Sequence, residues 1–356
     1  MTVALPARPS PSPAAKPARR PSLATTLVLA VSLLSVLAGL IGGWQALRWA
    51  EADRAAREQR LLSRTVYGIQ REIAIALEER ARDVEQVRAL LESELADAPP
   101  AQRRAVMTRV VDSNPNFSWL GEVALNGQIR TASRELLEGI SVAGRDWFEG
   151  GAASDLYVGD LHPAKLLEKH LHNDDGTPLR LLDIAMPLRD ARGQVVAVLG
   201  SHLNWRMVTR SVQDMLAGPE GQGLAAALVA VDGEILYDSQ GIQGQVATRL
   251  PDETNRMQQV TWPAPAGPAL ALMAPLGADG VGRDLRWRIV VRSPMSAWEA
   301  DLSRLRWRVA ALSAALALLL SLLGLVLMRG LGEPLDRKST RLNSSHSQQS
   351  RMPSSA

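Results

Sequence analysis

Two long runs of the sequence contain no charged residue and lie near opposite ends of the chain, at Leu23–Trp44 and Val309–Met328. At about 1.5 Å of rise per helical residue, each run can cover the roughly 30 Å core of a bilayer. Trp44, Trp49 and Trp307 stand at their edges, where amphipathic rings favour the membrane interface. We therefore expect two transmembrane helices. The first run is too long for a cleaved signal peptide, and no clear small-residue cleavage site follows it.

Between these runs, residues Glu51–Ala96 carry apolar side chains near helical spacing on a background of Ala, Glu and Arg. The pattern ends before Pro99 and Pro100, because two prolines stop a helix. The apolar positions are Leu61, Ile69, Ile73, Leu77, Val84, Val87 and Leu91. A helix of this length extends about 70 Å, so we expect a stalk that leaves the membrane and can pair with a partner chain in a homodimer.

Small residues recur every four positions in the first apolar run, at Ser35, Gly39 and Gly43. Such a stripe allows two helices to approach closely inside a membrane. It predicts dimerisation through the spans as well as the stalk, although small residues are also common in spans that do not associate.

The region after the stalk contains two similar hairpin patterns. Asn126-Gly127 and Asp232-Gly233 each separate two apolar runs, and these dipeptides favour the type I′ turn of a hairpin because they tolerate positive φ. A second hairpin follows each of them, with turns expected near Asp190–Gly193 and Gly277–Arg283. The repetition predicts two antiparallel-sheet modules in tandem, each of a normal domain size.

Composition and charge narrow the function classes. The chain has 356 residues, of which 46% are hydrophobic, and no cysteine, which excludes disulfides, thiolate metal sites and cysteine nucleophiles. Its formal charge of +3 arises in Asp336–Ala356, and the rest of the chain is balanced, so no nucleic-acid partner is indicated. The sequence contains no Gly-rich phosphate loop and no Ser-His-Asp spacing. We therefore expect no catalytic residues, no cofactor and no enzyme activity in this chain.

The orientation in the membrane follows from the loops. Residues Met1–Ser22 form a Pro-rich segment with four basic residues and no acidic one, which predicts a disordered cytoplasmic arm. Basic residues also flank the other ends of the spans, but a loop as long as the one between them crosses the membrane largely regardless of charge. We expect the inner membrane of a bacterium, with the large loop periplasmic and both termini cytoplasmic.

The stretch "VAGRDWFEGGAASDLYVGDLHPAKLL", continued by "LLDIAMPLRDARGQVVAVLGSHLNW", resembles double Cache sensor domains, and the resemblance is concentrated in Ser141–Trp205. "LRWRIVVRSPMSAW" is similar to the closing strand of the second module of that family. The resemblance implies an α+β fold in which two transmembrane helices flank a stalk helix and two tandem PAS-like antiparallel-sheet modules.

The expected organisation has eight parts. They are a disordered tail (1–22), a transmembrane helix (23–44), the stalk (45–100), a membrane-distal module (101–215), a membrane-proximal module (216–306), a second transmembrane helix (307–329), the start of a cytoplasmic region (330–335) and a foreign tail (336–356).

The segment Arg145-x-Trp147-Phe148 is the main candidate for a binding site. A planar guanidinium can hold a carboxylate through two hydrogen bonds, and the rings would form a desolvated wall. The resemblance implies that this motif lines the membrane-distal pocket of sensors that bind amino acids or other small anions. The alternative is that Arg145 pairs with a carboxylate of the protein and Trp147 belongs to the core.

The resemblance also implies contacts from tyrosine and aspartate to a ligand amine, which Tyr157, Asp160 and Asp183 can supply. An aspartate of the family's pattern is absent from "GSHLNW", where Ser201 and His202 stand instead. His202 is therefore included in the candidate site, and the ligand is expected to be small and anionic rather than necessarily an amino acid.

The segment between the candidate motif and the next strand contains histidines and aspartates, which are residue types that can bind a metal ion. These residues are His162, His170, His172, Asp174 and Asp175. Loop residues beside Asp-Asp-Gly are typical of a solvated turn, and His170 and His172 share a face only in an extended segment. We expect no metal ligand in this set.

The end of the chain, "DRKSTRLNSSHSQQSRMPSSA", resembles a translated sequencing adapter. Asp336–His346 and Ser350–Ala356 both back-translate, in order, to parts of a common read-through adapter. We therefore expect the natural sequence to diverge near Leu335 and to continue into a cytoplasmic output domain.

These observations predict the sensory half of a transmembrane receptor. The resemblance implies a diguanylate cyclase as the output domain, with a sensor histidine kinase or a chemoreceptor as alternatives. A membrane-anchored binding protein without enzymatic output is the alternative of a different class.

Overall fold

The computed structural model describes residues 23–174, 176–247, 250, 256–276 and 280–346, and the predicted disordered tail lies outside them. The chain divides into two compact units, one formed by residues 1–52 and 302–356 and the other by residues 53–301. Helices α1 (Leu23–Glu92) and α5 (Met295–His346) contribute to both units. The first part of the predicted foreign tail belongs to α5, and residues 347–356 lie outside the described part.

The first unit contains the two apolar runs. Both lie in helices that are long and apolar enough to cross a membrane, and only 6% of the most apolar window of α1 and none of that of α5 is buried. Leu29, Leu33 and Leu312 are 63%, 62% and 71% exposed. Side chains this apolar would be buried in a soluble protein, so their exposure fits lipid-facing spans.

The small residues of α1 have a partner within the chain. A Cβ atom added at Gly43 would lie 2.3 Å from the Ser313 hydroxyl of α5, and one at Gly39 would lie 3.4 Å from the Ser313 carbonyl oxygen. Ser35 donates its hydroxyl hydrogen bond to the Val31 carbonyl within α1. The two glycines therefore allow α1 and α5 of one chain to approach closely, and the homodimer stays a prediction.

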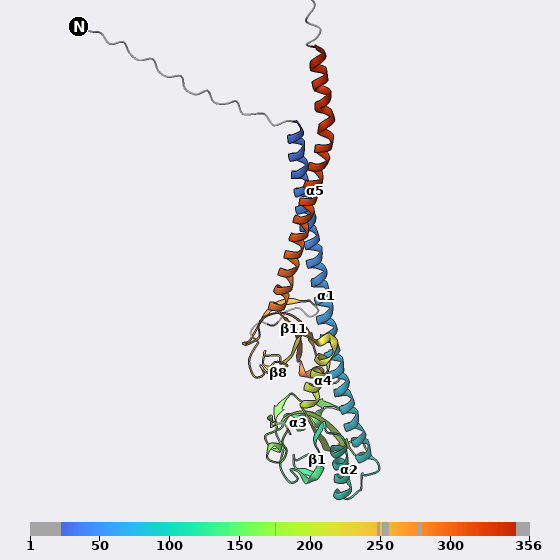
Figure 1. Cartoon of the computed structure of the whole chain (residues 1–356). Helices are drawn as coiled ribbons and strands as arrows, with labels where there is room; N and C mark the ends of the chain where they lie inside the picture. Colours follow the sequence, from blue (N-terminus) through green and yellow to red (C-terminus); the bar gives the residue numbers. More distant parts are fainter. Residues whose placement is uncertain (1–22, 175, 248–249, 251–255, 277–279, 347–356) are drawn as a thin grey trace, which may run out of the picture. The chain divides into compact units, whose positions relative to one another are not determined.

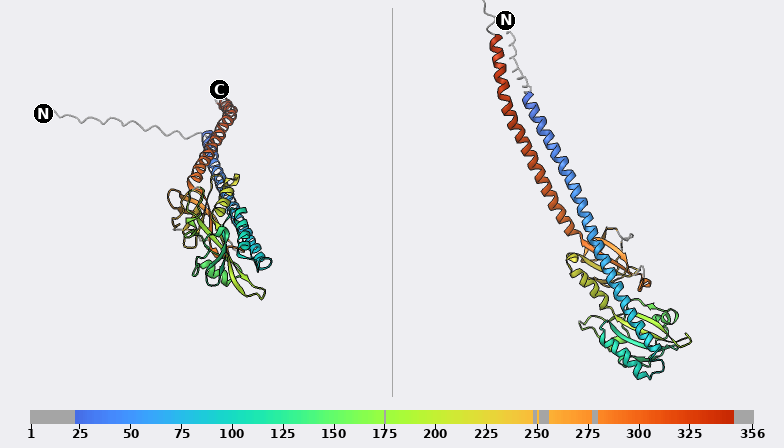
Figure 2. Two further views of the ribbon diagram at one scale, coloured as in Figure 1. Left: turned by 90° about the horizontal axis from the view of Figure 1, so that it is seen from below. Right: turned by 90° about the vertical axis from the view of Figure 1, so that its right-hand side faces the viewer.

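In the second unit, the stalk part of α1 runs beside both modules (Figure 1 and Figure 2). It buries an apolar stripe against both sheets. Its fully buried members are Leu62, Val66, Ile69, Ile73, Leu77 and Val84. The stripe was predicted to begin at Leu61, which is only half-buried, because the helix turns Leu62 toward the core instead. The apolar face that was considered for a partner chain is thus used within the protein.

The first module is a six-stranded antiparallel sheet in the order β2-β1-β6-β5-β3, with β4 also paired to β5. Its strands are β1 (Phe117–Ala124), β2 (Ile129–Ala132), β3 (Tyr157–Val158), β4 (His162–Pro163), β5 (Arg180–Arg189) and β6 (Val195–Asn204). Alternate residues of β5 face opposite sides. Leu182 and Ile184 join the core beneath the stalk, whereas Leu181 and Ala185 join a second core that contains Trp119.

The second module repeats this arrangement in the order β8-β7-β11-β10-β9. Its strands are β7 (Ala225–Val229), β8 (Ile235–Asp238), β9 (Gln258–Trp262), β10 (Gly267–Pro275) and β11 (Arg288–Pro294). The equivalent strand orders confirm the predicted α+β fold with tandem antiparallel modules.

The predicted hairpins are present in both sheets. Gly127 and Gly233 have φ of +83° and +92° and join β1 to β2 and β7 to β8. Gly193 closes the turn between β5 and β6 by donating to the Asp190 carbonyl at 2.8 Å. Strands β10 and β11 also pair, although residues 277–279 of their connection lie outside the described part.

Helices complete the modules. They are α2 (Pro100–Ser113), η1 (Ser133–Glu135), α3 (Asp146–Ala153), η2 (Leu167–Lys169), α4 (Arg206–Ala217), η3 (Pro219–Gly221) and η4 (Arg283–Leu285). Helix α2 was not predicted. Pro99 and Pro100 end the stalk as expected, but proline also suits the first turn of a helix, and Pro100 begins α2 there.

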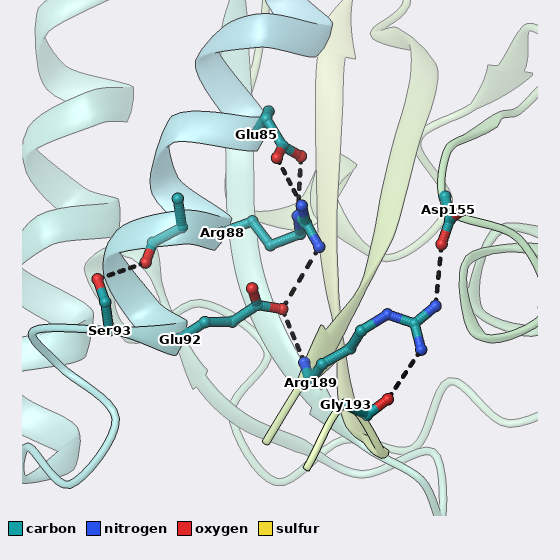
Figure 3. A network of polar contacts seen from close by, with 8 residues as sticks. Glu85, Arg88, Glu92, Ser93, Asp155, Arg189 and Gly193 are labelled. Carbon is teal, nitrogen blue, oxygen red and sulfur yellow. Dashed lines mark hydrogen bonds and ion pairs between the residues drawn. The ribbon is translucent and has the colours of Figure 1, made fainter. Parts of the chain in front are cut away.

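Polar contacts fasten the end of the stalk to the first sheet (Figure 3). The Arg88 guanidinium bridges Glu85 and Glu92 at 2.5 and 3.5 Å. The Glu92 carboxylate accepts a hydrogen bond from the backbone N–H of Arg189, and the Arg189 guanidinium contacts Asp155 at 2.9 Å. These contacts fix the register of the stalk against the β5–β6 hairpin.

A buried ion pair lies inside the second module. The Arg292 NH2 group donates to Asp238 Oδ1 at 3.0 Å, and NH1 lies 2.8 Å from Oδ2 without the alignment of a hydrogen bond. The Asp238 side chain is 0% exposed and that of Arg292 is 2% exposed. Trp262 Nε1 and the Gln240 backbone N–H also donate to Asp238. The carboxylate is therefore almost fully satisfied by donors from three parts of the module.

Helix α2 is attached to the first sheet by a bidentate ion pair. Arg104 donates to both oxygens of Glu138 at 2.7 Å, and the Ala132 N–H also donates to that carboxylate. The bond from Arg104 lowers the pKa of Glu138 below its ordinary value, although partial burial opposes this.

Replacement Glu138→Gln is expected to lower Tm at neutral pH by about 2–4 °C. Because the folded-state pKa is depressed, this stabilisation is present above the unfolded pKa of about 4.3 and is lost as the pH falls through the folded pKa. Thermal unfolding from pH 7 to pH 3 measures the effect, and the two proteins should converge at the acid end. Glu135→Gln is the control. Glu135 contacts the same arginine, but its side chain is 72% exposed and the contact, at 3.3 Å, is longer. Equal losses in both variants would contradict the prediction.

Candidate ligand pocket

Two tryptophans form the wall of the candidate site on the face of the first sheet that α3 covers. Trp119 comes from β1 and Trp147 from α3, and their ring centroids are 6.1 Å apart. They lie over Gly121 and Gly200, which face each other in the register of β1 and β6. A Cβ atom added at Gly200 would lie 2.4 Å from the Trp147 ring, and one at Gly121 would lie 2.2 Å from the Trp119 ring. The two glycines therefore provide the space that both rings fill.

A buried carboxylate lies beside these rings. Asp183 of β5 and His202 of β6 are register partners, and His202 Nδ1 is 2.6 Å from Asp183 Oδ1. His162 of β4 places Nε2 2.9 Å from both Asp183 oxygens. The Asp183 side chain is only 5% exposed, and the His202 ring stacks on Trp119 with 4.9 Å between centroids. Three neighbouring strands thus bring two imidazoles onto one carboxylate.

The electrostatics of this group follow from its contacts. Burial alone would raise the pKa of Asp183, but the attraction of His202 and the hydrogen bonds from both histidines outweigh it and lower the pKa to about 2. Burial opposes the charged form of His162, yet its bond to Asp183 raises its pKa above the ordinary value. Burial, with Asp146 and Asp183 nearby, raises the pKa of Tyr157. Asp183 is therefore a permanent anion at neutral pH.

Two cations lie at the mouth of the site. Arg145 is the N-cap residue of α3, and Lys165 follows β4. Both are exposed and line a cavity of about 270 Å³ together with Trp147, Tyr157 and Asp183. They also line a neighbouring small cavity, of about 40 Å³, with Trp119 and His202. No carboxylate of residues 23–174, 176–247, 250, 256–276 or 280–346 forms an ion pair with Arg145, in contrast to the alternative of a structural pair.

The structure brings most of the predicted site residues together. Arg145, Trp147, Tyr157, Asp160 and Asp183 line the larger cavity. His202 lines the smaller one. Phe148 lines neither cavity, because it points into the core and packs edge-on against Trp147 at 6.3 Å. Its predicted role as part of the pocket wall is therefore taken by Trp119.

Asp160 also connects the two modules. Its Oδ1 atom accepts a hydrogen bond of 2.7 Å from Nε1 of Trp287, which precedes β11 and is fully buried. The Trp287 ring meets Trp205 of the first module edge-on at 5.3 Å. A residue of the cavity wall is thus bonded directly to the second module.

Sequence reasoning missed the roles of His162, Lys165 and Trp119. His162 was considered only with the histidines of the following loop, but its strand pairing with β5 separates it from them. His170, His172 and Asp174 line neither cavity, and Asp175 lies outside the described part. The alternation of the strand "FSWLGEVA" could have placed Trp119 on the face that carries Gly121.

A third cavity, of about 440 Å³, lies between the modules. Arg180, Arg206 and Arg210 line it, and its lining contains no carboxylate and no histidine. Arg180 donates to the Leu236 carbonyl at 3.3 Å. This cavity is larger and also has aromatic rings in its wall, from Trp205 and Tyr237, but it lacks the buried carboxylate of the first site.

The fold is similar to those of solved sensor domains. The ligand-binding domain of the Pseudomonas fluorescens chemoreceptor CtaA in complex with L-serine matches with a TM-score of 0.51 at 17% identity, over 68% of this chain and 99% of that one. Its complex with L-isoleucine matches with a TM-score of 0.51 at 17% identity, over 70% and 98%. The extracellular domain of rpHK1S-Z16, described as a histidine kinase, matches with a TM-score of 0.51 at 12% identity, over 67% and 95%.

Neither a protein-family model nor a curated protein matches the sequence. The structural neighbours are a chemoreceptor ligand-binding domain and an extracellular domain, and the fold predicted from the resemblance to double Cache domains is confirmed. Among the described residues, two helices are long and apolar enough to span a membrane.

Proposed function

We propose that this chain is the input part of a receptor in the bacterial inner membrane and binds a small organic anion in the Arg145 cavity of its membrane-distal module. The region between the spans lies outside the cytoplasm, and both termini lie inside it. The observation that carries the proposal is an arginine without a protein carboxylate partner in the described residues, at a cavity walled by Trp147. A guanidinium binds a carboxylate through two parallel bonds, and the ring limits competition from water.

The contacts favour a carboxylate ligand over a zwitterionic amino acid. CtaA is solved with L-serine and L-isoleucine, which carry both a carboxylate and an amine. In this chain, both Asp183 oxygens already contact imidazole nitrogens, and Asp160 Oδ1 accepts from Trp287. Asp146, which also lines the cavity, is the carboxylate that remains for an ammonium group, while Arg145 and Lys165 both offer donors to an anion.

The proposed signal passes from Asp160 to Trp287. A ligand that changes the position of Asp160 changes a contact of the second module, whose last strand ends at Pro294, directly before α5. An output domain that exists in two states can be biased by such a change if the ligand favours one state. We assign a diguanylate cyclase as output on the resemblance alone, with a histidine kinase or a chemoreceptor second, and a homodimer as the signalling state in the lipid bilayer.

A thermal-shift screen of the full chain in detergent tests the ligand site. Mono- and dicarboxylates and amino acids are compared on the wild type and on Arg145→Ala. Loss of the bidentate contact is expected to weaken binding of the active compound by about 2–5 kcal/mol, which is roughly 30-fold or more.

Arg210→Ala is the matched control, because Arg210 lines the cavity between the modules and not the proposed site. It should bind the active compound as the wild type does. If Arg145→Ala binds equally well and Arg210→Ala loses binding, the ligand site is the cavity between the modules and the assignment to Arg145 is wrong.

A further inference from the structure

The group His162, Asp183 and His202 has the composition of a metal site. Its ligand atoms all lie within 4.8 Å of one another. The donors come from β4, β5 and β6, which are neighbours in the sheet, and Asp183 is in register with His202. Backbone pairing therefore holds the three side chains in place, and apolar rings surround them on the Trp119 side.

Each ring nitrogen of His162 lies beside an oxygen atom that accepts hydrogen bonds. Its Nδ1 atom lies 3.1 Å from the Pro163 carbonyl oxygen, which can only accept, so this contact favours the tautomer with the hydrogen on Nδ1. A neutral ring then directs the lone pair of Nε2 at the Asp183 carboxylate 2.9 Å away, which is also an acceptor. Two acceptors cannot face each other without a proton or a metal ion between them. A backbone carbonyl that fixes the tautomer in this way is also the usual second partner of a metal-binding histidine.

We propose that His162 Nε2, the Asp183 carboxylate and His202 Nδ1 bind a divalent transition metal ion, with Zn²⁺ as the probe. Two imidazoles and one carboxylate are a common ligand set for Zn²⁺, whereas Mg²⁺ and Ca²⁺ prefer oxygen ligands alone. Bonds of about 2.0–2.2 Å place tetrahedral donors roughly 3.3 Å apart. The present separations of 2.6 and 2.9 Å must therefore open slightly. His162 can move, because its side chain is 37% exposed and its strand has two residues.

Three protein ligands leave a fourth coordination position open. His162 and Asp183 both line the 270 Å³ cavity, so this position is accessible to water or to a ligand oxygen from that side. The metal site does not rest on the proposed function, since the three donors are present whether or not an organic anion binds near Arg145.

The test is calorimetric titration of ZnCl₂ into the full chain, purified in detergent without a histidine tag and stripped with chelator. The expected result is one Zn²⁺ per chain for the wild type, with affinity reduced at least about tenfold in His162→Gln and in His202→Gln. His170→Gln is the matched control, because His170 is exposed and lies outside the group. It should bind Zn²⁺ as the wild type does.

Circular dichroism checks that each variant is folded. His162→Gln should disturb the fold least, because the His162 ring is partly exposed. Substitution of Co²⁺ gives a second readout, since a tetrahedral site with nitrogen and oxygen donors produces intense visible absorption that His162→Gln should lose. The proposal is overturned if the wild type binds no Zn²⁺, or if His162→Gln and His170→Gln bind it alike. Either result leaves the Arg145 screen unaffected, so failure of the metal site and failure of the anion site are distinguishable.

Discussion

Replacement Arg292→Met is expected to lower the free energy of unfolding by about 3–5 kcal/mol, the usual cost of leaving one partner of a buried ion pair without the other. Methionine fills a similar volume but leaves the Asp238 carboxylate, 0% exposed, with only the neutral donors Trp262 and Gln240. Burial of an unpaired charge outweighs the cost of any lost packing. Pulse proteolysis of the full chain across a urea series measures the change.

Arg288→Met is the control, because Arg288 lies in the same strand and makes only a 3.5 Å contact with the Val231 carbonyl. It should change stability by less than about 0.5 kcal/mol. Adding Asp238→Asn to Arg292→Met removes the buried charge but keeps an acceptor for Trp262, so it should recover part of the loss. Equal losses of unfolding free energy in Arg292→Met and Arg288→Met would contradict the prediction.

Replacement Gly200→Ala is expected to destabilise the chain by about 1–3 kcal/mol, as overpacking does, and to abolish ligand binding near Arg145. The new methyl group would lie 2.4 and 2.9 Å from two atoms of the Trp147 ring, so the ring must move out of the cavity wall. Helix α3, which carries both Trp147 and its N-cap Arg145, must move with it. Pulse proteolysis and the carboxylate screen measure the two effects.

Gly218→Ala should be tolerated, because an added Cβ there would be 3.5 Å from the Met215 carbonyl oxygen and its φ is −68°. In the double variant Gly200→Ala, Trp147→Leu, the smaller side chain relieves the clash, so the two destabilisations should not add. Full additivity in this cycle would show that Gly200 acts through something other than the Trp147 ring.

The turns were the most predictable part of this fold. Asn126-Gly127 and Asp232-Gly233 specify hairpins locally, because positive φ is a property of the dipeptide itself. Together with these hairpins, the two apolar spans and the long apolar stripe of α1 were enough to predict the fold class. Helix α2 was missed because Pro100 was interpreted only as a stop signal. Strand β9 was missed because "QQVTW" has too few apolar residues to be recognised without its partner β10.

The part of the site that local sequence patterns specify was predicted, and the part that depends on strand pairing was not. Arg145 and Trp147 lie two residues apart at the start of one helix, so a local motif reveals both. The contact of His162 with Asp183 and His202 depends on pairing between β4, β5 and β6, and no local pattern records that pairing. Asp160 was expected to face a ligand, but its bond to Trp287 arises from packing between modules that are far apart in sequence.

The apolar stripe of the stalk has a consequence for biogenesis. Leu77 packs against the region of Gly282, and Gln70 donates to the Pro275 carbonyl, so the stalk is covered by strands that are synthesised much later. About 200 residues separate Leu91 from Val291 in the same core, and at roughly 5–20 residues per second their synthesis takes about 10–40 s. During that interval a row of isoleucine, leucine and valine side chains has no partner. We therefore expect slower synthesis after the stalk to increase aggregation of the nascent chain.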